Sequence, residues 1–522
     1  MSLNPQIVQD LELENIHNHV PLKTTWGHAC FTNQLKSPVA DPNIIKLNQK
    51  QILLFKKFPD LRQSICMELD NIDQEAIQSL TSNNDPIVVE SLSQIFWKKD
   101  AFGSFFNTVP FVLNGLITWK TIVLPGVAIL MPLIALIVPF LVLNMTSSIS
   151  TSDYLVHVKH VLLQQISIPS FLRSKGTDDR IGFLFESLFI GLTLATFISS
   201  LWNQIQSALH LRSIWNNVQI QGRAILKMVS VSRNMLEQLK TLDMKYQRVL
   251  RSIIHRGEEL HEKCKMLPND ELVAFGSIWN DITLIEELSE WIGRVDALAA
   301  IASLDNICIP RISAKVELNL REVSHPELQT CIKNSFSAGG TTSTHAILTG
   351  PNRGGKTTFC RALGLAIITA QTWGFAWARR MTWSPFSTIY TALETNGVLG
   401  NMSKFESEID FAKTVLGTQG SCFVMMDEIF HSTNATDGVA ASTVFLKQLY
   451  DRKDIISLIS THYKELATLF GKSSATVVQM VAHEKPGGKL EYTYTMAPGI
   501  SGTSSVMEIL AERGLLAVKE TN

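Results

Sequence analysis

Charge is scarce in this sequence. Asp, Glu, Lys and Arg make up 18% of its 522 residues, below the level of about 25% that is usual in soluble domains, and the mean hydropathy is positive at +0.13. The 46 basic residues balance the 47 acidic ones, so the whole chain has no net field that would attract a polyanion. Low charge and positive hydropathy indicate a membrane-associated chain, whereas net charge predicts no partner.

Paired cysteines are also missing. The seven cysteines lie singly and form no CxxC or CxxH pair, so neither a structural zinc site nor a disulfide framework is expected. The opening stretch MSLNPQIVQDLELE has no apolar core and predicts no N-terminal secretory signal. There is no internal repeat and no low-complexity tract. A chain of this length predicts about two to four domains.

Two long uncharged runs interrupt an otherwise helical pattern. Residues 44–98 repeat apolar positions at three- and four-residue steps, as soluble helices do. From Thr121 to Met145 the chain then runs 25 residues without a charge, enough to cross about 30 Å of hydrocarbon at about 1.5 Å per residue. A second uncharged run, from Ser187 to Leu209, carries Trp202 near its polar end, as an interfacial anchor would.

These runs predict a transmembrane helical hairpin with spans near 121–143 and 187–207. Prolines in the first span remove helix hydrogen bonds, which membrane helices tolerate with a bend. Two buried core helices are the alternative for both runs. Residues 101–119 are also uncharged, but their asparagines and glycines favour an interfacial or re-entrant piece, and we do not count them as a span.

The hairpin places the loop 146–182 on the far side of the membrane, because both halves of the helical region have to pack together on the near side. The positive-inside tendency opposes this placement. The basic residues concerned are Lys159, Arg173, Lys175 and Arg180.

Positive charge collects after the apolar region. Residues 211–265 hold 11 Lys or Arg against 5 Asp or Glu, on helices whose leucine stripe is typical of packing. A solvated helix face explains this excess most simply, and contact with DNA phosphate or anionic lipid is the alternative. After Pro310 the pattern changes to short strands and glycine turns.

The strongest motif is GPNRGGKT, which fits GxxxxGK[ST], follows a predicted strand from His345 to Thr349 and opens a predicted helix to about Thr372. In such a loop, backbone N–H groups wrap the phosphates, Lys356 reaches the β- and γ-phosphates, and the Thr357 hydroxyl binds Mg²⁺. The sequence therefore predicts a site for ATP with Mg²⁺. Its phosphate-binding residues are Gly350, Pro351, Asn352, Arg353, Gly354, Gly355, Lys356, Thr357 and Thr358.

A second apolar strand, CFVMMDE, ends in two acids. Asp427 is placed to hold Mg²⁺, and Glu428 is placed to act as the base for the attacking water. Taken alone, such a pair is also found as a helix cap, but its separation from the P-loop fits a Walker B strand. Because an ATP site needs cellular nucleotide and the cysteines are unpaired, the ATPase domain is expected to face the cytosol.

Together, the motifs resemble the MutS family. LTGPNRGGKTT resembles its P-loop, in which Asn352 and the paired glycines are characteristic. SKFESE from Ser403 matches its SxFxxE signature, the stretch from Asp427 to Gly438 matches its DEx₃[GS]Tx₃DG segment, and STHY from Ser460 matches its THY switch.

The resemblance implies roles for single residues. His462 would sense the γ-phosphate and the attacking water, acting with Glu428 and Lys356, although a histidine after the strand ISLIS is otherwise most simply a buried core residue. Ser403 would approach the γ-phosphate bound by a partner subunit, which implies a homodimer. The signature and the dimer seam would comprise Ser403, Phe405, Glu408, Thr433 and Asp437.

Flanking segments extend the resemblance. REVSHPEL, with His325, resembles the segment that opens the family's ATPase domain, and Ile332 and Asn334 sit where its adenine pocket lies. Cys331 stands where an aromatic residue usually stacks on adenine, which leaves the base preference open. The segment 498–511 resembles the one that completes the dimer interface.

Two helical segments are similar to the opening and the end of the family's helical core, Gly27–Lys50 and Trp291–Leu304. The resemblance implies that the apolar region, residues 100–210, occupies the place of the family's DNA-gripping clamp. No mismatch-reading, connector, nuclease or helix-turn-helix domain is expected.

The predicted fold class is α + α/β: a helical core or lever domain with a transmembrane helical hairpin, followed by an ABC-type P-loop ATPase domain. The expected domains are two halves of the helical core at 1–100 and 210–306, the apolar insertion at 101–209, and the ATPase domain at 307–522.

The predicted function is that of a dimeric, membrane-anchored ATPase that moves helical levers. The alternative is a soluble intracellular ATPase of mismatch repair or another DNA repair or recombination step, which binds DNA through 211–265. A scaffold in which nucleotide only locks a dimer is disfavoured, because the catalytic residues are intact.

Overall fold

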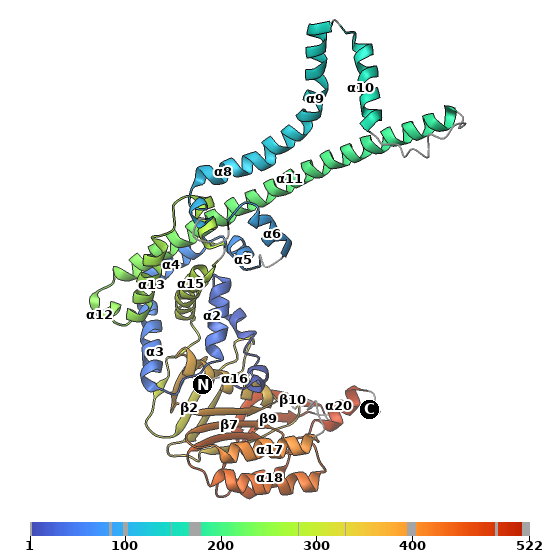
Figure 1. The fold of residues 1–522 in the computed structure, drawn as a ribbon. Coiled ribbons are helices and arrows are strands. Elements are labelled where there is room, and N and C mark those ends of the chain that lie inside the picture. The colour runs from blue at the N-terminus through green and yellow to red at the C-terminus, as the bar shows by residue number, and fades with distance from the viewer. Residues whose placement is uncertain are drawn as a thin grey trace. The chain divides into compact units, whose positions relative to one another are not determined.

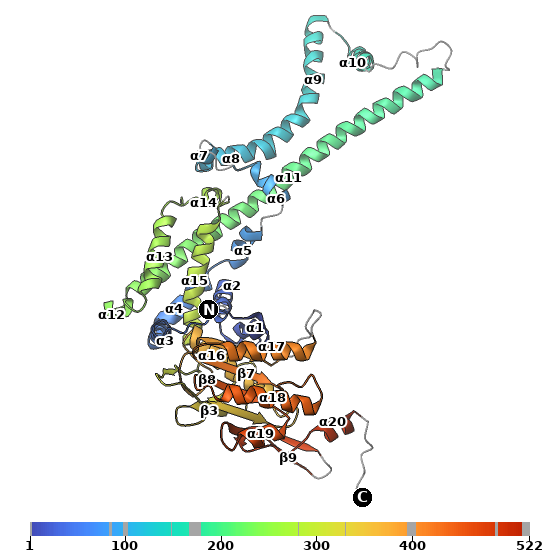
Figure 2. The same cartoon turned by 60° about the horizontal axis from the view of Figure 1, so that its bottom comes forward.

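The computed structural model describes two compact units of the chain (Figures 1 and 2). The first comprises Met1–Asn71, Ser232–Glu258 and Glu287–Asn522, and the second comprises Ile72–Val231 and Glu259–Glu286. The described residues are 3–82, 86–97, 103–147, 149–165, 179–279, 281–328, 330–393, 403–485 and 489–513. The domain borders expected from the sequence remain predictions.

A six-stranded sheet carries the nucleotide motifs in the first unit. Its order is β10-β9-β4-β8-β7-β6, and all neighbours are parallel except β10, which runs antiparallel to β9. The strands are β4 His345–Thr349, β6 Thr388–Ala392, β7 Cys422–Asp427, β8 Ile455–Ser460, β9 Thr476–Glu484 and β10 Leu490–Pro498. In register, Ser460 pairs with both Leu348 and Asp427, so the segments that follow β4, β7 and β8 meet at one edge.

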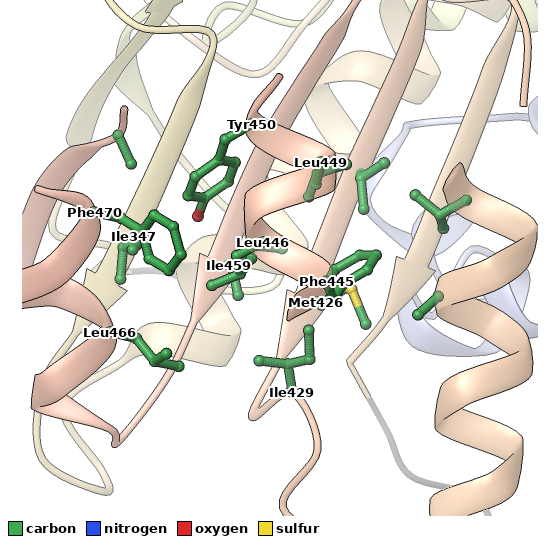
Figure 3. Packing of buried hydrophobic residues seen from close by; sticks show 14 of the residues in the cluster. Ile347, Met426, Ile429, Phe445, Leu446, Leu449, Tyr450, Ile459, Leu466 and Phe470 are labelled. Carbon is green, nitrogen blue, oxygen red and sulfur yellow. The ribbon is translucent and has the colours of Figure 1, made fainter. Parts of the chain in front are cut away.

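Helices cover both faces of this sheet. They are α16 Lys356–Thr372, α17 Lys404–Gly417, α18 Ala435–Tyr450 and α19 Lys464–Phe470. At the edge of the sheet, α20 Val506–Glu512 contacts β10 through Glu508, which accepts from the Leu490 N–H at 2.9 Å. Figure 3 shows Ile347, Met426 and Ile459 of the sheet packed against side chains of α18 and α19. Burial of this apolar surface stabilises the fold by about 25 cal/mol per Å². The strand before the P-loop and the helix after it are confirmed at the predicted residues.

A second sheet has the order β1-β5-β2-β3. Its strands are β1 Arg311–Ile312, β2 Glu317–Val323, β3 Asn334–Gly339 and β5 Arg380–Trp383. The predicted change from helices to strands after Pro310 is confirmed by the start of β1. Strand β2 leads into His325 and β3 begins at Asn334, so this sheet supplies residues expected near the adenine base.

The helical part of the first unit joins segments from both ends of the sequence. Its helices are α1 Pro5–Asp10, η1 Ile16–His19, α2 Thr25–Leu35, α3 Pro42–Lys57, α4 Pro59–Leu69, α12 Met244–Gln247 and parts of α11, α13 and α15. Arg294 Nη2 donates to Asn48 Oδ1 at 3.1 Å, and Arg62 Nη1 donates to the Ala302 carbonyl at 3.0 Å. The two halves of the helical core therefore pack together here, as predicted.

The N-terminal segment is attached to the six-stranded sheet by hydrogen bonds of Asp10, which is fully buried. Its carboxylate Oδ2 accepts hydrogen bonds from Thr391 Oγ1 at 2.7 Å and from the Leu393 N–H at 3.0 Å. Its carbonyl accepts from Arg361 Nε of α16 at 3.0 Å. Leu11 fills the space beside Gly364 of the same helix, where an added Cβ would lie 2.6 Å from the leucine side chain. The first residues thus hold both β6 and α16.

The second unit is helical (Figure 1). Its helices are α5 Gln74–Ser82, α6 Pro86–Ser93, α7 Gly103–Phe106, α8 Pro110–Thr118, the π-helical turn η2 Trp119–Val123, α9 Leu124–Ser147, α10 Thr151–Gln165 and α14 Glu271–Ile278. Three helices cross the unit border: α11 Asp179–Lys240, α13 Arg251–Cys264 and α15 Thr283–Ala302. Asn107 is fixed by hydrogen bonds in both directions with the Trp97 backbone, at 3.0 and 2.8 Å.

One uninterrupted helical run joins α8, η2 and α9. The π-helical turn lies just before Pro125, whose ring would otherwise collide with the carbonyl of Thr121. The helix continues through Pro139. A local π-helical adjustment thus accompanies the first proline, and helix formation is not prevented.

The predicted pair of spans is not found among the described residues. One stretch, Pro110–Met131, is long and apolar enough to cross a membrane by length and composition, and 11% of its tested window is buried. This stretch begins within residues 101–119, which were expected to form an interfacial or re-entrant piece. Asn107 precedes the helix, and Pro110 is the first residue of α8. The second predicted span, 187–207, lies within α11. Of the predicted loop 146–182, residues 148 and 166–178, with Arg173 and Lys175, lie outside the described residues.

Candidate functional site

The P-loop joins β4 to α16 and takes a strained turn. Arg353 has φ +65° and Gly355 has φ +89°, in the left-handed region, and a Cβ at Gly354 would lie 2.9 Å from the Pro351 carbonyl. The first turn of α16 therefore points its N–H groups into the loop, which makes an anion site. Arg353 Nη1 also pairs with Glu512 of α20 at 2.5 Å, which fastens the outside of the loop.

Lys356 is 6% exposed and turns back onto the loop that carries it. Its ammonium donates to the carbonyls of Gly350 at 3.1 Å and Pro351 at 3.3 Å. Burial lowers the pKa of Lys356, and the nearby Asp427 and Glu428 carboxylates oppose that shift. The ammonium thus lies inside the loop, where a bound phosphate would replace the two carbonyls as its hydrogen-bond acceptor.

The two expected Mg²⁺ ligands lie together. Thr357 Oγ1 donates to Asp427 Oδ2 at 2.7 Å, and Ser460 Oγ makes a short hydrogen bond to Asp427 Oδ1. A hydroxyl and a carboxylate side by side are oxygen donors that suit Mg²⁺, which usually keeps waters and phosphate oxygens as its other ligands. No group of three His, Cys, Asp or Glu side chains able to hold a metal alone is found in the described part of the chain.

Glu428 and His462 lie together at the other end of the site. His462 Nε2 lies 2.9 Å from Glu428 Oε1 and 3.4 Å from Lys356 Nζ. Because a carboxylate and an ammonium make opposite demands on Nε2, the shorter contact indicates that Nε2 carries the hydrogen and donates to Glu428. This hydrogen bond lowers the pKa of Glu428. The carboxylate is therefore ionised near neutral pH.

A cavity of about 550 Å³ is lined by Lys356, Thr357 and Glu428 and by the residues expected around the adenine base. His325 lies in its wall, 5% exposed, with Nε2 buried and without a hydrogen-bond partner among the described residues. Burial lowers the pKa of His325. Ile332 exposes 47% of its surface beside Cys331 in the same wall. The P-loop residues from Pro351 to Thr358 line the cavity, as do Asp427 and Glu428.

Tyr494 is a cavity residue that sequence reasoning missed. It stands on β10, where the pairing with β9 shifts register, and it has φ +54°. Asn334 fixes this irregularity, since its Nδ2 donates to the Tyr494 carbonyl at 2.9 Å and its Oδ1 accepts from the Met496 N–H at 2.7 Å. The tyrosine ring lies 3.2 Å from a Cβ built on Gly355. No motif marks such a residue, because only the register shift turns its ring into the cavity.

The expected signature residues do not all face outward. Ser403 is the exposed N-cap of α17 and forms a capping box with Glu406, at 2.8 and 3.2 Å. Phe405 and Glu408, by contrast, point to their own chain, toward Phe430 and Ser432. Ser403 alone of these three is an exposed residue at the helix terminus.

The two remaining seam residues lie at the start of α18. Asp437 is exposed, its N–H donates to the N-cap Asn434 at 2.9 Å, and its carboxylate accepts from Asn434 Nδ2 at 2.5 Å. Thr433 is half-buried just before that cap. Asp437 therefore has a helix-capping role within its own chain, and a role at a dimer seam remains a prediction for both.

Comparison with known proteins agrees with this geometry. Residues 346–517 match the family model described as MutS domain V. The endonuclease MutS2 of Pediococcus pentosaceus is 30% identical over 265 residues, which cover 49% of this chain and 33% of that protein. The DNA mismatch repair protein MutS of Alkaliphilus metalliredigens is 27% identical over 249 residues, which cover 46% of this chain and 28% of that protein.

The chain thus matches about a third of the length of these curated relatives. The shared part is the one that holds the P-loop, the Asp427–Glu428 pair and His462. Residues 346–517 are therefore similar to domain V of the MutS family.

Proposed function

We propose that the chain binds ATP with Mg²⁺ and hydrolyses the ATP to ADP and phosphate. The observation that carries this proposal is that Lys356, Thr357, Asp427 and Glu428 line one cavity, together with residues suited to a base. A cavity of about 550 Å³ is within the range that encloses a small-molecule ligand.

The phosphate end works by rearranging existing contacts. On ATP entry, Lys356 exchanges the carbonyls of Gly350 and Pro351 for the β- and γ-phosphates, and the first turn of α16 directs its N–H groups at them. Thr357 and Asp427 are the side chains that would hold Mg²⁺, which neutralises charge on the transferred phosphoryl group.

The hydrolytic end depends on an ionised carboxylate. Glu428, with its pKa lowered by the hydrogen bond from His462, accepts a proton from the water that attacks the γ-phosphate. His462 holds that carboxylate in place. The other neighbour of His462, Lys356, brings its positive charge to within 3.4 Å of the same ring.

Adenine would stack on Tyr494. The tyrosine lies in the cavity wall, while Cys331 has no ring to offer. His325 Nε2, buried and without a partner among the described residues, is a donor or acceptor for the nucleoside. Tyr494 thus replaces the aromatic residue that the resemblance places at position 331.

The active form would be a homodimer with shared sites. The Ser403 hydroxyl oxygen accepts from the Glu406 N–H, which leaves its hydrogen for donation to a γ-phosphate on the partner subunit. Exposure of Ser403 at the N-terminus of α17 supports this role, because a helix N-terminus favours an anion.

Two variants test the hydrolysis. Lys356→Ala should abolish nucleotide binding, whereas Glu428→Gln should bind ATP and fail to hydrolyse it, because only the base is removed. Binding is followed with a fluorescent ATP analogue and turnover by phosphate release. Substantial turnover by the Glu428→Gln protein would contradict the assignment of the base.

For the role that hydrolysis serves, we propose a step of DNA repair or recombination. The names of the two relatives support it. The basic helices offer phosphate contacts, although ion pairs such as Arg223–Glu271, Lys240–Glu258 and Arg256–Glu287 neutralise part of their charge. Binding to duplex DNA that weakens steeply with salt is the expected result. Absence of DNA binding at low salt, with or without nucleotide, would contradict this role.

Membrane anchoring with nucleotide-driven movement of the levers is a second candidate role, which the relatives' names favour less. Its support is the exposure of large apolar side chains on α9 and α11, such as Leu130 at 54%, Val142 at 54% and Leu192 at 61%. No charged residue occurs between Thr121 and Ser152. In flotation with liposomes, the full chain should rise with the lipid and a variant lacking 101–209 should not. A full chain that stays at the bottom would exclude the anchor.

A further inference from the structure

Helix α17 holds the loop that follows the catalytic glutamate of its own chain. Glu408 is on the inner side of α17, with 15% of its side chain exposed, and its Oε2 accepts from Ser432 Oγ at 2.9 Å. One turn earlier, the Phe405 ring meets Phe430 edge to face, with centroids 5.9 Å apart. Two of the expected signature side chains thus contact the segment 428–432.

This segment has a backbone that needs such support. Glu428 has φ +54° and Phe430 has φ +51°, although neither is glycine. Side chains with a Cβ rarely adopt the left-handed region, and such residues persist where the surroundings hold them. On either side, the Glu428 N–H donates to the Ser460 carbonyl at 3.0 Å, and Phe430 packs on Phe445. The conformation of the base therefore depends on contacts outside the segment.

His431 lies between the carboxylate of Glu408 and the backbone carbonyl of Glu428. Its Nδ1 donates to the Glu428 carbonyl at 2.7 Å and lies 3.6 Å from Glu408 Oε1. That oxygen is buried and has no hydrogen-bond partner among the residues described. A buried carboxylate oxygen is unfavourable unless a positive or hydrogen-bearing group faces it, and the N–H edge of His431 is the group placed to do so.

We propose that Glu408 is a positioning residue for hydrolysis, acting through Ser432 and His431 on the backbone of Glu428. The proposal rests on the ATPase function proposed above. Glu408 fixes Ser432 directly and orients the imidazole of His431, and His431 fixes the carbonyl of Glu428. These contacts stabilise the left-handed backbone conformation of Glu428, from which its carboxylate points into the cavity.

The arrangement has a consequence for the dimer. The same helix carries Ser403 at its N-cap and Glu408 on its inner side. A small movement of α17, caused by contact between Ser403 and the partner's γ-phosphate, therefore reaches the base of its own subunit. Displacement of a reacting group by about 1 Å can lower a rate by about 10²-fold, so this link is sufficient to couple the two sites.

The test compares single-turnover hydrolysis with nucleotide affinity in the full chain. Glu408→Gln keeps the side-chain size but can turn an amide N–H toward the donor on His431. We expect hydrolysis to slow by about ten- to a hundredfold, while the Kd for a non-hydrolysable ATP analogue changes less than about threefold. Asp410→Asn is the matched control, since it removes one negative charge from the exposed face of the same helix; it should retain the wild-type rate.

A double variant separates positioning from general damage. His431→Ala should also slow hydrolysis, and Glu408→Gln combined with His431→Ala should be no slower than the slower single variant, because both act on one chain of contacts. Wild-type hydrolysis by Glu408→Gln, a matching loss of nucleotide affinity, or independent multiplication of the two effects would each overturn the proposal. Failure of the unmodified chain to hydrolyse ATP would instead overturn the proposed function.

Discussion

His462 Nε2 lies 2.9 Å from Glu428 Oε1 although 34 positions separate them. The contact follows from the sheet, because β7 and β8 are parallel neighbours that end in register at Asp427 and Ser460. Residues that follow these two strands must meet at the sheet edge. A hydrogen bond formed there orients the carboxylate and lowers the pKa of Glu428.

Removal of the imidazole should therefore impair hydrolysis more than binding. We expect His462→Ala to lower kcat by about 10²-fold or more, within the range found for acid–base and positioning groups, with the Kd for ATP changed by a small factor. Steady-state ATPase assays and titration with a fluorescent nucleotide measure the two effects. His483→Ala, at an exposed position on β9, is the control. An unchanged kcat for His462→Ala would remove this residue from the site.

Complementation between inactive chains should reveal a shared site. Ser403→Arg disables the signature and Lys356→Ala disables the P-loop, so each homodimer should be inactive. A mixed dimer keeps one site with an intact P-loop and an intact signature from the partner, so each mixed dimer should have up to half the activity of a wild-type dimer. Mixed dimers that form, as shown by differently tagged chains, but remain inactive would contradict a signature acting in trans.

Tyr494 should determine nucleotide affinity through its ring. Tyr494→Ala should weaken ATP binding by about 1–3 kcal/mol, the usual contribution of stacking between a base and an aromatic side chain, or about 5- to 150-fold in Kd. Tyr494→Phe should bind nearly as the wild type does, because the ring is kept. Isothermal titration with ADP measures both. Equal affinity of the alanine variant would show that the base binds elsewhere.

Because His345 is buried and its pKa is lowered, we expect the protein to lose stability on acidification. His345 is fully buried on β4, with Ser457 Oγ and the Arg452 carbonyl as hydrogen-bond partners at 2.9 and 3.0 Å. Burial lowers the pKa of His345 from 6.5 to about 4. Between these values the unfolded chain binds more protons than the folded chain, so the free energy of unfolding falls as the pH drops from about 6.5 to about 4.

The full effect at one histidine is about 3 kcal/mol, because each tenfold difference in proton affinity between the folded and unfolded chains corresponds to about 1.4 kcal/mol. Urea unfolding at pH 7 and pH 4.5 should therefore show a smaller difference in His345→Asn than in the wild type. The exposed His483→Asn is the control for loss of a histidine. An identical pH dependence in wild type and His345→Asn would contradict the buried neutral state.

Sequence motifs predicted the parts of the site whose residues lie close together in one short stretch of the chain. The P-loop needs its glycines and lysine in one order, and an apolar strand ending in Asp427 and Glu428 can be recognised without knowledge of its neighbours. These elements are confirmed where they were predicted. Tyr494 escaped because its orientation depends on a register shift between β9 and β10, which leaves no pattern in the residues themselves.

Side-chain direction was the second obstacle. The SxFxxE pattern groups Ser403, Phe405 and Glu408 along the sequence, yet successive helix positions face different directions, and only Ser403 is exposed at the end of α17. In the apolar region, hydropathy located an uncharged run correctly but placed the start of the helix too late, because Pro110 begins a helix that continues past the π-helical turn.

The hydrogen bonds of Asp10 to Thr391 and Leu393 join groups that are about 380 positions apart in the chain. During synthesis at about 5–20 residues per second, Asp10 leaves the ribosome roughly 20 to 75 s before its partners exist. Throughout that interval the side chain of Leu11, which is fully buried beside Gly364 in the finished protein, lacks the helix α16 that covers it. The N-terminal segment can therefore reach its buried position only after the six-stranded sheet has been made.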